Sequence, residues 1–77
     1  MDAEVVMAIL GERVKESREL AGLSKTQLAE RSGYSRGAIT SIEDGSRDTL
    51  PMQTILDIAQ VLKKDWTEWF DFKKEVG

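Results

Sequence analysis

Six polar side chains between residues 24 and 47 are the groups of this sequence best suited to chemistry, and that chemistry is hydrogen bonding. Arginine can donate two parallel hydrogen bonds to a flat acceptor edge such as that of guanine, and lysine holds an anion as a point charge. The chain has no histidine and no cysteine, so the usual imidazole and thiolate ligands and bases are absent. We therefore expect a binding protein with no catalytic residue, metal or cofactor. The six residues are Lys25, Ser35, Arg36, Thr40, Ser41 and Arg47.

Capping signals place these residues on and around two short helices, predicted over about 25–32 and 35–44. A serine followed three residues later by glutamine forms a capping box before the first helix, and a second serine can cap the next one. Glycine can take the positive φ angle that ends a helix and turns the chain. The signals in chain order are Ser24 with Gln27, then Gly33, Ser35 and Gly45.

Helical periodicity predicts three further helices around this pair. An amphipathic helix is expected from about Val6 to Ala21, and a fourth helix runs from a first turn containing Pro51 to about Leu62. A short terminal helix starts at Asp65 and carries four aromatic residues. The prediction is an all-α, compact five-helix bundle that forms a single domain over residues 1–77. The four aromatic residues are Trp66, Trp69, Phe70 and Phe72.

The net charge of -3 argues against a protein that binds nucleic acid over its whole surface. The acidity lies at the two ends, however, because residues 11–47 carry 7 basic and 6 acidic side chains. One local face can therefore still bind a polyanion. The longest apolar run, residues 5–10, is far too short to span a membrane, so we expect a cytoplasmic protein without a membrane partner.

Two short helices joined by a glycine-containing turn have the sequence form of a helix-turn-helix, here at about residues 24–45. The run LGERVKESRELAGLSKTQLAERSGYSRGAITSIEDGSR closely resembles the lambda-repressor-like (XRE or phage repressor/Cro type) helix-turn-helix family, over roughly residues 8–70. The resemblance implies a compact bundle of five helices that acts as a transcriptional regulator, usually as a dimer. It is carried by the Leu20-to-Ser24 junction, Leu28-Ala29, Gly33-Tyr34-Ser35, Ile39, and the exit Ile42-Glu43-x-Gly45-x-Arg47.

The resemblance also implies roles for individual residues in double-stranded DNA binding. The second helix would enter the major groove, where Arg36 reads a base, Gly37 permits close approach, and Thr40 and Ser41 reach outward. Phosphates would be held by Lys25, Ser35 and Arg47. Arg18 and Glu43 would form a structural ion pair.

Three features depart from the family pattern. Lys25 stands where glutamine usually opens the first helix of the motif, and Gly37 stands where many relatives have a polar side chain that contacts a base. The loop after Arg47 is one residue longer than is common.

The C-terminal segment carries more apolar surface than one core contact can use. Helical spacing puts Trp66 and Phe70 on one face, and Trp69, Phe72 and Val76 on another. One face is expected to close the core and the other to form a homodimer interface, and the spacing does not decide between them. We take Trp69, Phe72 and Val76 as the interface. The resulting hypothesis is a small transcriptional regulator, acting as a repressor, that binds a palindromic operator as a dimer. The alternative is a protein-interaction module of the same fold, such as an antitoxin or an adaptor with a protein partner.

Overall fold

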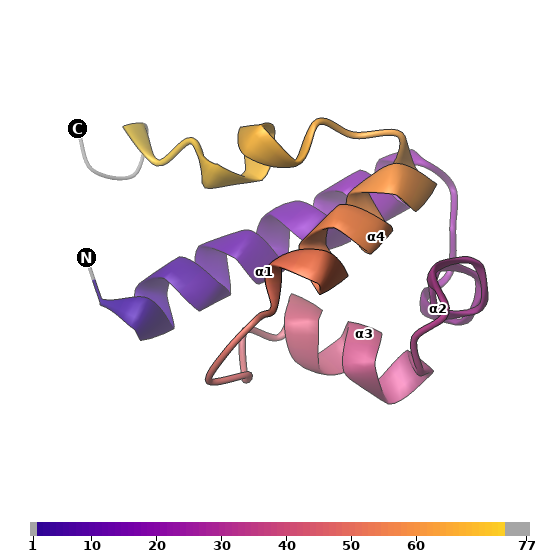
Figure 1. Cartoon of the computed structure of the whole chain (residues 1–77), viewed down its shortest axis with the longest axis horizontal. Helices are drawn as coiled ribbons and strands as arrows, with labels where there is room; N and C mark the ends of the chain where they lie inside the picture. Colours follow the sequence, from indigo (N-terminus) through magenta and orange to yellow (C-terminus); the bar gives the residue numbers. More distant parts are fainter. Residues whose placement is uncertain (1, 74–77) are drawn as a thin grey trace.

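The computed structural model describes residues 2–73, and in this part of the chain it consists of helices and connecting turns without a strand. The five predicted helical elements are present, although the last is a 3-10 helix and the first begins at Ala3 rather than near Val6. Pro51 flanks the fourth helix at its N-cap instead of lying in the first turn. In chain order the elements are α1 (Ala3–Leu20), α2 (Lys25–Ser32), α3 (Arg36–Glu43), α4 (Met52–Leu62) and η1 (Trp66–Phe70) (Figure 1).

The boundaries of α2 and α3 follow from local hydrogen bonds. The Ser24 hydroxyl accepts a bond from the Gln27 amide at 3.0 Å, and the Gln27 side chain accepts one from the Ser24 amide at 2.8 Å. Gly33 ends α2 with a φ of 83°, and the Ser35 hydroxyl then accepts a bond from the Ala38 amide at 3.0 Å. Only the turn Gly33-Tyr34-Ser35 separates the two helices.

The long helix α1 lies in the middle of the bundle, with α3 packed on one side and η1 on the other (Figure 1). Helix α2 contacts α3 and α4. None of the helices in residues 2–73 is long and apolar enough to cross a membrane. The buried apolar side chains come from every element and are Leu10, Val14, Leu28, Ala29, Ile39, Ile42, Ile55, Ile58, Ala59 and Trp69.

Glycine permits a close approach between α1 and the end of α3. A Cβ atom on Gly11 would lie 2.3 Å from the Ile42 carbonyl oxygen and 2.7 Å from that of Glu43. A side chain at this position would therefore push the two helices apart. Gly45 makes a similar contact one turn nearer the N-terminus of α1, where a Cβ atom on Gly45 would lie 2.7 Å from the Ala8 Cα.

The prediction that Trp69 faces a second subunit is wrong, because this residue belongs to the core of its own chain. Its side chain is only 2% exposed. Its indole N–H donates to the Ser17 hydroxyl at 3.0 Å, and its carbonyl accepts from Arg13 at 2.9 Å. Phe72 is half-buried, and the guanidinium carbon of Arg13 lies over its ring, 5.1 Å from the ring centre. Val76 lies outside the described residues.

Candidate nucleic-acid interface

The outward face of α3 brings together the residues predicted to reach DNA. Arg36 and Gly37 are exposed, and Thr40 and Ser41 are half-buried beside them. The opposite face of the helix is buried in the core through Ile39 and Ile42. These alternating exposures follow from a helix with one apolar stripe, so the four polar or small residues share the surface that is left.

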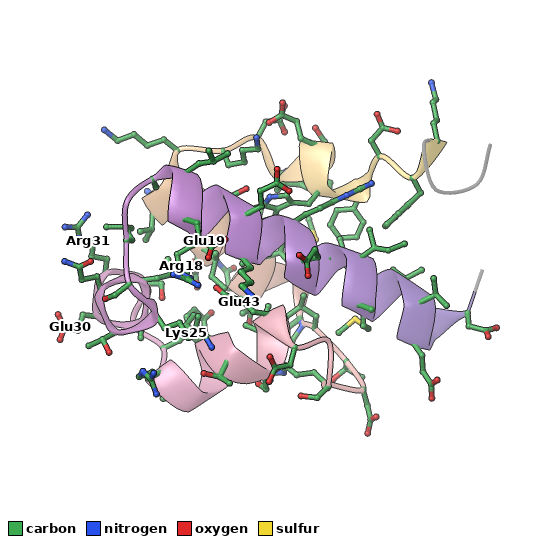
Figure 2. All side chains as sticks on the ribbon, turned by 180° about the vertical axis from the view of Figure 1, so that it is seen from behind. Arg18, Glu19, Lys25, Glu30, Arg31 and Glu43 are labelled. Carbon is green, nitrogen blue, oxygen red and sulfur yellow. The ribbon has the colours of Figure 1, made fainter. Side chains whose placement is uncertain are left out.

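The cationic side chains near this face have no partner in the part of the chain that the structure describes. Among residues 2–73, Lys25, Arg36 and Arg47 make no hydrogen bond or ion pair through their side chains. In Figure 2, Lys25 points from α2 toward α3, whereas Glu30 and Arg31 point away from the bundle. An uncompensated cation next to an exposed helix face can pair with an external anion such as phosphate.

The structure separates Arg47 from the other two cations. Lys25 and Arg36 belong to the first turns of α2 and α3, while Arg47 follows the C-terminal end of α3. It lines a groove with the first turns of α1, and two of its neighbours there, Glu4 and Asp48, are acidic. Arg47 therefore lies in a less cationic setting than Lys25 and Arg36.

Two of the predicted hydroxyl groups already make internal bonds. Ser35 caps α3, as described above, and the Ser41 hydroxyl donates to the Ala38 carbonyl at 2.9 Å. The hydroxyl oxygens keep acceptor capacity, but the Ser41 proton is engaged. Among the described residues, Thr40 makes no side-chain hydrogen bond and the Ser35 hydroxyl only accepts one, so these two hydroxyl groups are available as donors.

The ion pair that the resemblance implied is present behind α3. Arg18 of α1 donates from Nε to Glu43 Oε2 at 2.7 Å and from Nη2 to Oε1 at 3.1 Å. A third bond from Nη1 reaches the Leu23 carbonyl at 2.8 Å. The pair is buried between the helices (Figure 2), and the hydrogen bond to Glu43 raises the Arg18 pKa. It fixes the end of α3 to α1 and to the start of the helix-turn-helix.

A second cluster of polar side chains, which joins the turn of the motif to α4, was not predicted from the sequence. Tyr34 donates its hydroxyl to Asp57 Oδ2 at 2.7 Å, and Gln53 donates to Asp57 Oδ1 at 2.9 Å. These bonds lower the Asp57 pKa, with the larger effect from Tyr34. Tyr34 and Asp57 are 23 residues apart, so no local pattern in the sequence could have paired them.

The two capped helices, the short turn and the exposed second helix define a helix-turn-helix protein. Residues 9–67 match the family described as "Helix-turn-helix domain", and the chain belongs to this lambda-repressor-like family. Its fold is that of the DNA-binding transcription regulators of this type. A comparison with curated proteins gives no significant match.

Three solved structures of two similar proteins support the assignment. The restriction-modification controller protein C.AhdI from Aeromonas hydrophila shares 33% identity over 83% of this chain and 96% of its own, with a TM-score of 0.79. The N-terminal DNA-binding domain of SinR from Bacillus subtilis shares 27% identity over 86% and 96%, with a TM-score of 0.78. SinR, described as the master regulator for biofilm formation and solved in complex with DNA, shares 27% identity over 80% and 98%, with a TM-score of 0.76.

Proposed function

We propose that the protein binds double-stranded DNA in a sequence-specific way and represses transcription by occupying an operator. The observation that carries this proposal is the exposed face of α3, where Arg36 in the first turn has no partner within residues 2–73 and small or hydroxyl-bearing residues lie beside it. A buried ion pair and an N-cap hold this helix in place. SinR, a similar protein, has been solved in complex with DNA, which supports this function.

The contacts divide by chemistry. Arg36 is proposed to read a guanine, because its guanidinium can make the bidentate contact to O6 and N7 in the major groove. Lys25, and less strongly Arg47, are proposed to hold phosphates. Gly37 leaves open space on α3, since an added Cβ would meet only the Ser35 hydroxyl oxygen, at 3.9 Å. The backbone of α3 can therefore approach the bases closely at this point.

We infer that the protein is a homodimer and that α4 supplies the contact. With Trp69 in the core, the exposed apolar side chains on this helix are Met52 and Leu56, which are 43% and 37% exposed. Residues four apart lie on the same face of a helix, so the two form one stripe. A two-fold contact through this stripe would present two copies of α3 to a palindrome about 34 Å apart.

Selection of bound sequences from random DNA duplexes tests the proposal. We expect an enriched palindrome, and sedimentation of the protein as a dimer at tens of micromolar. Replacing Met52 and Leu56 by serine should give a folded monomer, whereas Leu20→Ser, which alters an exposed leucine on another element, should leave the dimer intact. Absence of any enriched sequence would contradict DNA reading.

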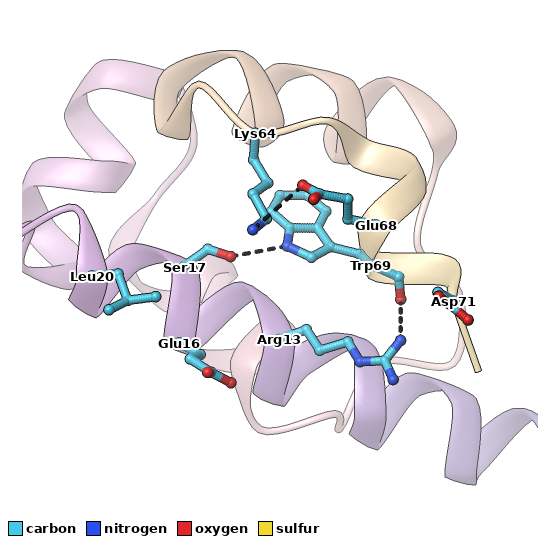
Figure 3. Close-up of a pocket in the computed structure, with 8 residues that line it drawn as sticks. All are labelled: Arg13, Glu16, Ser17, Leu20, Lys64, Glu68, Trp69 and Asp71. Carbon is cyan, nitrogen blue, oxygen red and sulfur yellow. Dashed lines mark hydrogen bonds and ion pairs between the residues drawn. The ribbon is translucent and has the colours of Figure 1, made fainter. Parts of the chain in front are cut away.

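A protein-interaction module is the second candidate, and a groove on the side of α1 opposite α3 favours it. The groove has a volume of about 420 Å³ and lies between α1 and the segment around η1 (Figure 3). Leu20 at its edge is 81% exposed, more than any other large apolar side chain described. SinR, a structural neighbour, has also been solved in a complex with SinI. A failed DNA selection would direct attention to this groove.

A further inference from the structure

The turn of the helix-turn-helix is tied to α4 by a bracket of three side chains, Tyr34, Asp57 and Gln53. Tyr34 is the middle residue of the turn, and its hydroxyl donates to one oxygen of Asp57 at 2.7 Å. Gln53, one helical turn earlier on α4, donates to the other oxygen at 2.9 Å. Both carboxylate oxygens are therefore engaged, which fixes the direction in which Asp57 accepts the tyrosine.

The bracket supplies a connection that the main packing of α3 does not. Helix α3 packs mainly on α1 and α2, while α4 packs on α2 and η1. Tyr34 comes two residues before the start of α3, so a bond from its hydroxyl to α4 reaches the N-terminal end of the exposed helix. The orientation of that end relative to α4 is consequently defined by these two hydrogen bonds as well as by the apolar core.

The same helix also carries the stripe formed by Met52 and Leu56. Gln53 and Asp57 each follow a stripe residue directly, so the bracket and the stripe occupy adjacent faces of α4. A change in the bracket would alter the position of α3 relative to the stripe without removing a contact between α3 and DNA.

We propose that the Tyr34–Asp57–Gln53 bracket sets the separation at which the dimer presents its two recognition helices, and so selects operators by the spacing of their half-sites. This inference rests on the proposed function, including the α4 contact between subunits. The three residues act as positioning residues, because they need not touch a base. The preferred distance between half-sites depends on both recognition helices of the dimer. A change in that preference therefore distinguishes this role from a loss of fold or of direct DNA contacts.

The experiment uses the palindrome obtained by selection, together with duplexes in which the spacing is one base pair shorter or longer, and a duplex with a single half-site. Fluorescence anisotropy gives the affinity of each for the wild type, Tyr34→Phe, Asp57→Asn and Gln53→Ala. Glu12→Gln is the control, since Glu12 is exposed on α1, away from both the bracket and the stripe, and makes no side-chain bond within residues 2–73. Circular dichroism checks the helix content of each variant.

For Tyr34→Phe, which keeps the ring and removes one hydrogen bond, we expect the preference for the selected spacing to fall about fivefold while single half-site affinity changes less than about twofold. Gln53→Ala should fall in the same direction by less. Asp57→Asn keeps an acceptor for the tyrosine and should retain more of the preference than Tyr34→Phe. Glu12→Gln should match the wild type in its spacing preference.

Two results would overturn the inference. One is a spacing preference in Tyr34→Phe equal to that of the wild type. The other is an equal loss on the single half-site and on every palindrome, which would place the effect in the motif of one subunit. If Tyr34→Phe loses helix content, Gln53→Ala and Asp57→Asn decide by the same criteria. Failure of the wild type to select any palindrome would instead refute the proposed function.

Discussion

Removing the charge of Glu43 tests how the recognition helix is held. Its carboxylate accepts two bonds from Arg18, at 2.7 and 3.1 Å, and the two side chains are 1% and 9% exposed. In Glu43→Gln one of the two acceptors becomes an NH₂ group that faces the donors of the guanidinium. Arg18 keeps its bond to the Leu23 carbonyl, but its charge stays buried without a counter-ion.

The expected cost follows from this burial. A buried ion left without its partner destabilises a protein by about 3 to 5 kcal/mol. A chain of 77 residues has a total stability of roughly 4 to 12 kcal/mol at the usual value per residue. Each kcal/mol lowers the melting temperature of a domain of this size by about 4 to 8 °C, so Glu43→Gln should lower it by at least about 12 °C.

Urea unfolding followed by tryptophan fluorescence measures the loss, and the chain contains its own control. Lys64 and Glu68 form an exposed pair at 3.4 Å, with side chains 37% and 58% exposed. Glu68→Gln should cost at most about 1 kcal/mol. The double change Arg18→Leu with Glu43→Leu removes both charges and should be more stable than Glu43→Gln. If Glu43→Gln costs no more than Glu68→Gln, the argument from burial is wrong.

Four further outcomes are expected. Gly11→Ala should destabilise the protein by about 1 to 3 kcal/mol, because its Cβ overlaps carbonyl oxygens of α3, and chemical denaturation would detect this. Gly37→Ala meets open space and should stabilise α3 by about 0.5 to 1 kcal/mol; a lower melting temperature would contradict this. Arg36→Ala should cost about 1 to 3 kcal/mol of DNA-binding free energy and relax sequence preference at one position in each half-site, and a uniform loss across operator variants would refute its role in reading a base. Lys25→Ala should instead weaken binding to all duplexes alike and flatten the salt dependence. Hydrogen bonds from Tyr34 and Gln53 lower the Asp57 pKa in the folded state, so its contribution to stability is present above the unfolded pKa of about 4 and is lost as the pH falls below it; Asp57→Asn should flatten this part of a melting-temperature profile.

Interactions between residues near in sequence could be predicted without a structure. Ser24 bonds to Gln27, three residues along the chain, and Ser35 to the amide of Ala38 at the same spacing. Gly33 needs only its own conformational freedom to take a φ of 83°. The two helices of the motif and the exposed face of α3 therefore depend on interactions between residues close in sequence, which residue types and spacing are enough to predict.

The C-terminal segment shows where this kind of reasoning stops. Its aromatic residues could be placed on two faces, but the sequence alone could not say which face meets the core. Trp69 packs in the apolar core, where Ser17 and Arg13, more than 50 residues earlier, satisfy its indole N–H and its carbonyl. The same segment forms a 3-10 helix, which shifts the register assumed for an α-helix.

By itself, the sequence determined the helical class, the position of the helix-turn-helix and the small and polar residues that α3 carries. Only the tertiary structure decided that Gly11 is a contact point between α1 and α3, that Tyr34 is held by Asp57, and that Trp69 is a core residue. The physical reason is that these contacts join distant parts of the chain. Their existence depends on how whole helices pack, and no residue's immediate neighbours carry that information.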